Sequence, residues 1–126
     1  MLSATRCSRW ADQTYAELCV VKASSLAKIP AGLDLIEAAA LPLVTTTGNQ
    51  LISVGTGIQS GQTVLVNGAV GNVGRSAVFT AKDRGAVVIA GVLKRQVQEA
   101  ASLGADQIVA TDDEKSMANL PAGCGR

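Results

Sequence analysis

Histidine is absent from this sequence, and aromatic side chains are nearly absent. The 126 residues include no histidine, which removes the commonest metal ligand and general base from any site that the chain forms. Aromatic residues are 2% of the chain, namely Trp10, Tyr15 and Phe79, so stacking surfaces for single-stranded nucleic acid are scarce. The formal net charge of +1 leaves little cationic excess to bind a phosphate backbone. We therefore expect no nucleic-acid partner.

Long apolar runs and paired cysteines are also missing. No apolar run reaches the roughly 18 residues of a membrane-spanning helix. The charged segment 1–12 is not followed by the apolar stretch of a signal peptide, so we expect a cytoplasmic protein with no membrane partner. Cys7, Cys19 and Cys124 are widely spaced and form no Cys-x-x-Cys pair. Reduced, partly buried thiols are expected rather than a metal site.

What the sequence does contain is aliphatic. Hydrophobic residues make up 48% of the chain, mostly Ala, Val, Leu and Ile, so a globular fold is expected and disorder is not. The length allows one small domain with a hydrophobic core, but not two such domains.

The first half of the chain has weaker patterns. Residues 14–23 alternate and then run apolar, which predicts a strand, and residues 26–30 predict a very short one. Asp34 followed by Glu37 is a capping pattern that predicts a short helix to residue 40. Pro42 then suits the first turn of a second helix, which would run to about residue 54. The residues expected to face inward from it are Val44, Leu51, Ile52 and Val54.

The second half has a regular alternation of strands and helices. Continuously apolar strands are predicted at Thr63–Asn67, 87–90 and Gln107–Ala110, with helices between them at 72–84 and 96–103. The second helix would place Val97, Ala100, Ala101 and Leu103 inward and end at Gly104. This order predicts an α/β fold: an incomplete Rossmann-type domain whose parallel sheet has its three core strands ordered 3-2-1.

A glycine-rich bend joins the first of these strands to its helix. Ala69, Gly71 and Gly74 form the pattern A-x-G-x-x-G, which differs from G-x-G-x-x-G at its first position. Gly71 would let the backbone approach a pyrophosphate, and Gly74 would let the helix pack closely on the strand. Backbone N–H groups and the helix dipole would bind the anion. The alternative is a plain turn without a ligand.

The end of the second strand separates NAD from NADP. A carboxylate there would bind the ribose 2′-hydroxyl and repel a 2′-phosphate. This sequence instead has Gly91 and Val92, followed by Lys94 and Arg95, which favours NADPH. The alternative is that both cations are merely solvated residues of the next helix. Because basic residues at a helix N-terminus oppose its dipole, a functional role is favoured.

With these motifs in place, the chain resembles the quinone oxidoreductase-like branch of the medium-chain dehydrogenase/reductase superfamily, the relatives of the zinc-type alcohol dehydrogenases. The resemblance runs from Thr14 to Ala110. The segments that carry it are TYAE at 14–17, KIP at 28–30, EAAALPL at 37–43, GQTVLV at 61–66, AVGNVG at 69–74 and LGAD at 103–106.

The resemblance implies a function and a set of cofactor-binding residues. The family joins a GroES-like catalytic domain to a nucleotide-binding domain, and transfers hydride from NADPH to a quinone or to an activated alkene or carbonyl. The resemblance places Thr47 near the nicotinamide, Gly71, Val73 and Gly74 at the pyrophosphate, and Lys94 and Arg95 in the loop around the 2′-phosphate. The predicted NADPH-binding set is completed by Ala69, Asn72 and Gly91.

Some family features are missing. Gln96 stands where the family frequently has lysine, Thr111 stands where it often has a cofactor-contacting tyrosine, and the zinc ligands are absent. Thr47 has an alternative role as an ordinary buried hydroxyl of its helix. No catalytic residue is identified.

The resemblance also predicts how the chain is divided. Residues 1–32 would be a remnant of the catalytic domain, with a short strand, and residues 33–126 a partial nucleotide-binding domain. A truncated chain of this kind is expected to be incompetent alone and to self-associate through the exposed edge of the strand Thr63–Asn67.

Three other functional classes were weighed. The main alternative is a non-catalytic NADP(H)-binding module. A short-chain dehydrogenase is disfavoured because Tyr15 is followed four residues later by Cys19 rather than lysine. A P-loop NTPase is excluded because no Gly-Lys-Ser/Thr follows the bend.

Overall fold

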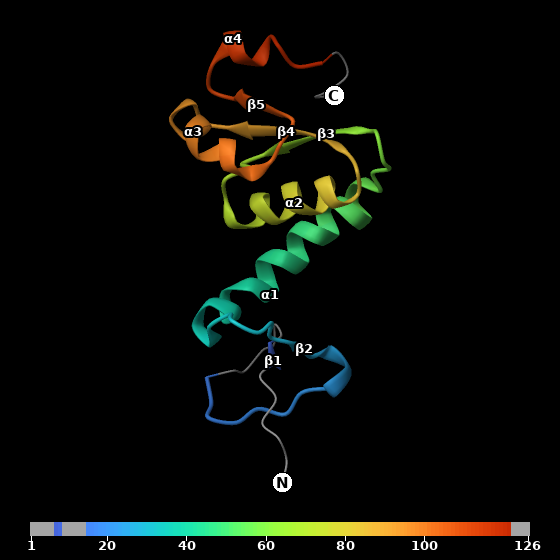
Figure 1. The fold of residues 1–126 in the computed structure, drawn as a ribbon, viewed down its shortest axis with the longest axis vertical. Helices are drawn as coiled ribbons and strands as arrows, with labels where there is room; N and C mark the ends of the chain where they lie inside the picture. The colour runs from blue at the N-terminus through green and yellow to red at the C-terminus, as the bar shows by residue number, and fades with distance from the viewer. Residues whose placement is uncertain (1–6, 9–14, 122–126) are drawn as a thin grey trace. The chain divides into compact units, whose positions relative to one another are not determined.

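The computed structural model describes residues 7–8 and 15–121. The chain divides into two compact units, Met1–Leu43 and Val44–Arg126, called here the first and the second unit. A two-stranded antiparallel sheet lies in the first and a three-stranded sheet in the second (Figure 1). The predicted α/β class is confirmed. Trp10, Cys124 and Thr14, the first residue of a predicted strand, lie outside the described residues, and the predicted division after residue 32 stays a prediction.

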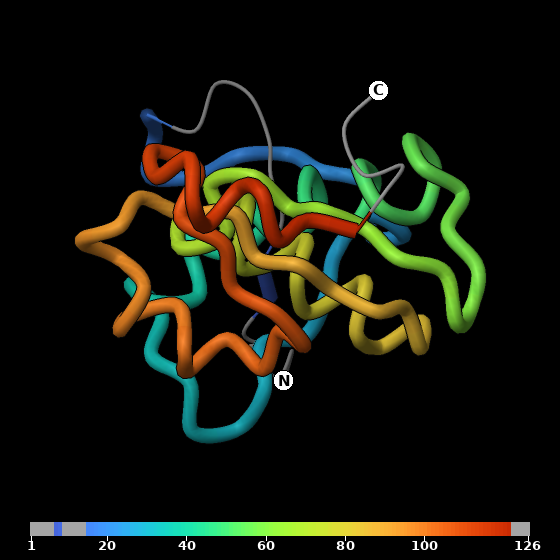
Figure 2. Tube along the Cα trace, turned by 90° about the horizontal axis from the view of Figure 1, so that it is seen from above, coloured from blue at the N-terminus to red at the C-terminus, as the bar shows by residue number. Residues whose placement is uncertain are grey.

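The sheet of the second unit consists of β3 (Thr63–Asn67), β4 (Val87–Val92) and β5 (Gln107–Ala110). The strands are parallel and lie in the order β3-β4-β5, side by side in Figure 2. Val64 is paired with Val88, and Ala90 with Ile108. This confirms the predicted 3-2-1 order, with β4 extending two residues beyond its predicted end.

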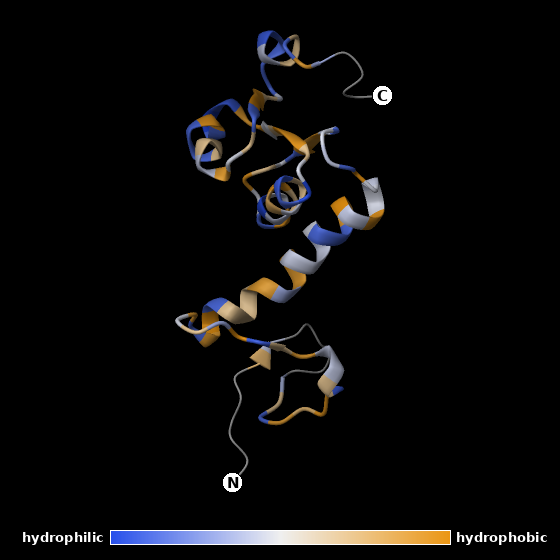
Figure 3. Cartoon of the chain, turned by 45° about the vertical axis from the view of Figure 1, so that its right-hand side comes forward, coloured by the Kyte–Doolittle hydropathy of each residue, from blue (hydrophilic) through white to orange (hydrophobic). Residues whose placement is uncertain are grey.

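Helix α2 (Asn72–Asp83) connects β3 to β4, as predicted, and lies on the same side of the sheet as α3 (Figure 1). The hydrophobic core of the unit lies between the helix and the sheet. In Figure 3 the strands of this sheet are coloured mainly as hydrophobic. Alternate residues of β4 enter this core because successive side chains of a strand point to opposite faces. The buried residues from α2 and the strands are Val66, Ala77, Val78, Ala81, Val88, Ala90 and Val92.

The predicted helix at 96–103 is only partly α-helical. It consists of α3 (Val97–Ala100) between the 3₁₀ turns η3 (Lys94–Gln96) and η4 (Ala101–Leu103). Ala100 is fully buried and Leu103 half-buried, but Val97 is 38% exposed and Ala101 is exposed, so half of the predicted inner stripe was wrong. The tighter 3₁₀ turns shift side chains away from the 3.6-residue period that the prediction used. Gly104 ends the segment at a positive φ of 72°, as predicted.

A last short helix, α4 (Glu114–Met117), follows β5 and was not predicted. It lies across the sheet from α2 and α3 (Figure 1). Its sequence signal is Asp113 at the N-cap, whose carboxylate accepts the Lys115 N–H at 3.1 Å.

Helix α1 (Leu35–Gln50) begins in the first unit and ends in the second. In the second unit it contacts α2 through a glycine that the sequence did not single out. A Cβ on Gly48 would lie 2.6 Å from the Cβ of Ser76 and 2.8 Å from the backbone nitrogen of Ala77. Ser76 also donates its hydroxyl hydrogen to the carbonyl of Thr45 at 3.1 Å. The two helices therefore touch almost backbone to backbone.

The predicted helix break at Pro42 was wrong. Pro42 lies inside α1, and the chain continues into a π-helical turn, η2 (Leu51–Thr56), which ends at Gly57. Of the residues predicted to face inward, Ile52 is buried and Val44 half-buried. Leu51 is 52% and Val54 79% exposed, so those two predictions were wrong. The wider turn of a π-helix displaces side chains from the α-helical period.

The first unit has a small sheet of β1 (Cys7–Ser8) and β2 (Ala27–Lys28), preceded by the turn η1 (Ala23–Ser25). The predicted short strand at 26–30 is confirmed as β2. The predicted strand at 14–23 was wrong over its described residues, where Tyr15, Leu18 and Val20 are almost fully exposed. Within the described part of the chain no strand pairs with this segment, so its apolar alternation has no surface to pack on.

Candidate functional site

The glycine-rich bend is tied to the neighbouring strand β4. Gly68 follows β3 directly and has a positive φ of 73°, in the left-handed region that favours glycine. The backbone N–H groups of Gly68 and Ala69 both donate to the carbonyl of Gly91, at 2.8 and 3.1 Å. Gly68 was not among the predicted site residues, although a glycine immediately after an apolar strand was the available signal. The bend is thereby positioned at the carboxyl end of the sheet.

Two glycines bring the start of α2 against the bend. A Cβ on Gly74 would lie 2.2 Å from the Gly68 oxygen and 2.9 Å from the Cα of Ala69. Gly71 has an extended backbone, and a Cβ there would lie 3.2 Å from the same Gly68 oxygen. A side chain at position 74 would therefore displace backbone, whereas one at position 71 requires a shift of only a few tenths of an ångström.

Three backbone donors remain open at the start of α2. The Gly71 N–H donates to the Gly68 carbonyl at 2.9 Å, and the Arg75 N–H to the Gly71 carbonyl at 2.8 Å. Among the described residues, nothing accepts the N–H groups of Asn72, Val73 or Gly74. Asn72 is exposed and Val73 is half-buried, while Ala69 is fully buried beneath them. Open N–H groups at the positive end of a 12-residue helix suit an anion such as a phosphate.

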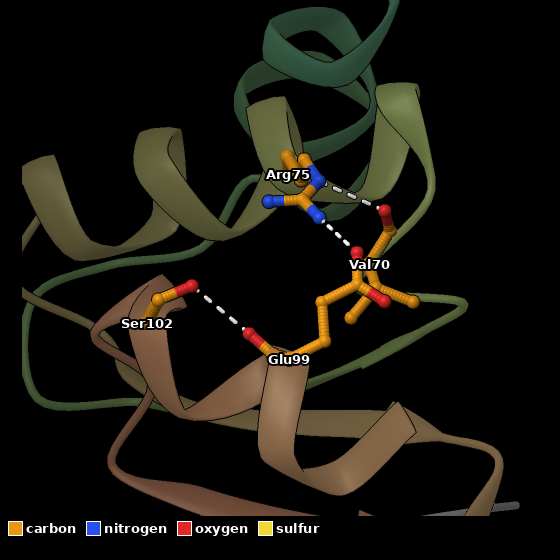
Figure 4. Close-up of polar contacts among 4 residues, drawn as sticks. All are labelled: Val70, Arg75, Glu99 and Ser102. Atoms are coloured by element: carbon orange, nitrogen blue, oxygen red, sulfur yellow. Dashed lines mark hydrogen bonds and ion pairs between the residues drawn. The ribbon is translucent and has the colours of Figure 1, made fainter. Parts of the chain in front are cut away.

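Arg75 holds the bend to α3 (Figure 4). Its Nε donates to the carbonyl of Val70 at 2.9 Å, and its Nη2 forms an ion pair with Glu99. Ser102 donates its hydroxyl hydrogen to the Glu99 carbonyl at 2.9 Å. Sequence reasoning missed this arginine, because its partner Glu99 lies 24 residues further along the chain.

The carboxyl ends of the three strands meet at Gly91. This glycine is buried, and a Cβ on it would lie 3.2 Å from Cγ2 of Thr111 and 3.3 Å from Cα of Asn67. Thr111 is held by its own hydrogen bonds, since its N–H donates to the carbonyl of Val92 at 2.8 Å and its hydroxyl to the same oxygen at 3.2 Å. The small residue at 91 lets the bend and both neighbouring strands approach.

The two predicted phosphate-binding cations are exposed in the segment after β4. The side chain of Arg95 forms no ion pair or hydrogen bond with any other described residue. Lys94 is different: its backbone N–H donates to Asp112 Oδ1 at 2.7 Å, and its Nζ lies 3.4 Å from Asp113 Oδ2. Gln96 accepts the Leu93 N–H through Oε1 at 3.1 Å, so its side chain closes the local turn.

Thr47 lies on α1 in the second unit, next to Gly48, which packs against Ser76 of α2. Thr47 is half-buried and lines an open, mainly apolar hollow of about 480 Å³. The other lining residues are Gln50, Leu51, Val54 and Gly55, and none belongs to the bend or to β4. The structure therefore brings together the predicted residues of the bend, Gly91 and the Lys94 segment, and Thr47 lines a hollow to which none of them contributes.

Neither a metal-binding group nor a membrane-spanning helix occurs among the described residues. Over 7–8 and 15–121, no group of three or more Cys, Asp or Glu residues is arranged to hold a metal ion. In the same part of the chain, no helix has the length and apolar character required to cross a membrane.

A parallel β-α-β-α-β sheet with a glycine bend at its carboxyl edge defines the class of a Rossmann-type nucleotide-binding unit. No family model matches the sequence. Acryloyl-coenzyme A reductase of Sulfurisphaera tokodaii is 41% identical over 78 residues, which are 62% of this chain and 23% of that protein. Erythronolide synthase of Saccharopolyspora erythraea is 37% identical over 76 residues, 60% of this chain and 2% of the synthase.

Solved structures agree with these sequence relatives. An NAD-dependent alcohol dehydrogenase is 37% identical with a TM-score of 0.70, over 80% of this chain and 30% of that one. A mycobacterial protein complexed with NADPH is 29% identical with a TM-score of 0.61, over 72% of this chain and 28% of that one. The chain belongs to the medium-chain dehydrogenase/reductase superfamily, which includes alcohol dehydrogenases, quinone oxidoreductases and enoyl reductases, and it covers part of that fold.

Proposed function

We propose that this chain supplies the nucleotide-binding part of an NADPH-dependent oxidoreductase that reduces a quinone or an activated alkene or carbonyl. The observation that carries the proposal is the bend. Three N–H groups are open at the start of α2, and the last of them belongs to Gly74, where a Cβ would displace the Gly68 oxygen. When bound, the cofactor supplies the hydride.

The bend residues fit a pyrophosphate. The N–H groups of Asn72, Val73 and Gly74 would donate to the phosphate oxygens, and Gly71 would keep the approach free of a side chain. The dipole of α2 adds about 0.3–1 kcal/mol for an anion at its first turn. Ala69, buried below, provides packing rather than a contact with the cofactor.

The choice of NADPH is supported by charge. β4 ends at Gly91 and Val92 without a carboxylate, and Lys94 and Arg95 follow as exposed cations able to bind a 2′-phosphate. One of the similar structures holds NADPH, while another is named as NAD-dependent, so relatives alone do not decide between the two.

The substrate class is supported by the named relatives. Acryloyl-coenzyme A reductase and the enoyl reductase of CurK are both reductases by name. The apolar hollow beside Thr47 would accept a nicotinamide ring or an apolar substrate, with the Thr47 hydroxyl as a polar contact. The alternative is a non-catalytic NADP(H)-binding module; the chain spans 23% of the length of acryloyl-coenzyme A reductase and 2% of that of the erythronolide synthase.

Two measurements on the same preparation test the proposal. Calorimetric titration with NADPH and NADH measures binding, and the loss of NADPH absorbance with a soluble quinone or an enoyl thioester measures turnover. NADPH binding with turnover supports the oxidoreductase, and NADPH binding without turnover supports the module. Failure to bind either cofactor would refute both.

A further inference from the structure

Lys94 lies beside two carboxylates of the segment that follows the neighbouring strand β5. β4 and β5 are parallel neighbours, so the segments that follow them emerge at the same edge of the sheet. Asp112 accepts the Lys94 backbone N–H at 2.7 Å, and Asp113 Oδ2 lies 3.4 Å from Lys94 Nζ. The missing carboxylate at the end of β4 is thus partly replaced from the β5–α4 segment.

The carboxylate of this pair is held more firmly than the ammonium. Asp113 caps α4 by accepting the Lys115 N–H, and its own N–H donates to the Ala110 carbonyl at 3.2 Å. Its side chain is 28% exposed, whereas that of Lys94 is 74% exposed. The flexible lysine is therefore drawn to a fixed negative charge.

We propose that Asp113 is a specificity-determining residue, which holds Lys94 away from the 2′-phosphate of a bound cofactor and so reduces the preference for NADPH over NADH. The inference rests on the proposed function, since it assumes that a dinucleotide binds at the bend. The guanidinium of Arg95, which has no partner in the described part of the chain, remains the cation available to the phosphate. Because exposed ion pairs are weak, the expected effect is modest, about two- to fivefold in affinity.

Asp113→Asn removes the charge and keeps an N-cap side chain, so α4 should persist. We expect it to tighten NADPH binding about two- to fivefold at low ionic strength and to leave NADH binding unchanged. Glu114→Gln is the matched control, because it removes the same charge from the next residue, which is exposed and forms no ion pair with any described residue. Asp113→Ser, another good N-cap without charge, serves if the asparagine variant folds poorly.

The same two substitutions must be repeated in a Lys94→Ala background. If Asp113 acts through Lys94, the gain from Asp113→Asn disappears there. A gain that persists without Lys94, that also appears in Glu114→Gln, or that raises NADH binding equally overturns the inference. If the unmodified chain binds neither NADPH nor NADH, the proposed function fails first, and the inference with it.

Discussion

The hydroxyl of Ser8 donates to the carbonyl of Ala38 at 3.3 Å. In a regular helix that carbonyl would accept the N–H of the residue four positions later, which is Pro42 and has none. Ala38 is 2% exposed, so its oxygen has little access to water. The strand residue therefore supplies the hydrogen bond that the proline removes, and α1 passes through Pro42 without ending.

Ser8→Ala should lower the free energy of unfolding by about 1 kcal/mol, because it leaves a buried carbonyl without a donor. The measurement is urea unfolding followed by circular dichroism. In a Pro42→Ala background the helix regains its own N–H, and the same substitution should cost much less. Equal losses in both backgrounds would show that the serine acts in another way.

Asp106 should contribute a pH-dependent part of the stability. Lys82 Nζ lies 2.7 and 2.8 Å from its two oxygens, and the Val88 N–H donates to it at 2.7 Å. Lys82 first, and then Val88, lower the pKa of Asp106 below its ordinary value of 3.8. A lowered folded-state pKa stabilises the fold above the unfolded-state pKa, and this contribution is lost as the pH falls through the folded-state value.

Asp106→Asn should therefore destabilise the chain near neutral pH and flatten the loss of stability below about pH 3.8. Thermal unfolding at several pH values measures both effects. Asp83→Asn removes a charge from an exposed residue that forms no ion pair with any described residue, and should leave the slope unchanged. An unchanged slope in Asp106→Asn would contradict the prediction.

Gly74→Val should weaken NADPH binding at least about tenfold, or 1.4 kcal/mol. Its Cβ would stand 2.2 Å from the Gly68 oxygen, so the start of α2 must move off the bend. Phe79→Val is the control, since it places the same side chain on the same helix at a position that is 74% exposed. Unchanged affinity in Gly74→Val, measured by calorimetry, would mean that the bend is only a turn.

Replacing Lys94 and Arg95 together with Ala should cost NADPH affinity and leave NADH affinity nearly unchanged. The reason is that only NADPH carries the 2′-phosphate these cations would bind. The measurement is the dissociation constant of the double variant for NADPH and for NADH, both at the same ionic strength. Equal losses for both cofactors would indicate general electrostatic attraction instead.

The outer edge of β3 should mediate self-association. Within the described residues β3 pairs only with β4, and its other edge has no strand beside it. Such edges invite pairing with a second chain, and charged side chains discourage it. Thr63→Lys should therefore reduce association in sedimentation velocity, while Gln107→Lys, on β5 at the opposite edge, should not. A chain that stays monomeric at high concentration would disprove the prediction.

Local patterns were sufficient where the signal was periodic or conformational. The apolar runs of β3, β4 and β5, the helical spacing of α2 and the glycine bend were all predicted close to their observed bounds. The pattern gave a wrong prediction at residues 15–23, where alternating apolar residues have no partner strand among the described residues. It was also wrong at Pro42, because the N–H that proline lacks is replaced by the hydroxyl of Ser8, 34 positions earlier in the chain.

The order of strands and helices could be predicted from the amino-acid pattern alone, because each element depends on the spacing of apolar residues along a short stretch of chain. The glycine bend was also predictable, because a glycine-rich turn directly after an apolar strand is a local feature. Three contacts became visible only in the folded chain: Gly48 packs against Ser76, Arg75 links Val70 to Glu99, and Asp113 forms an ion pair with Lys94. These contacts join residues distant in sequence, and their energies depend on distances that exist only once the sheet has formed.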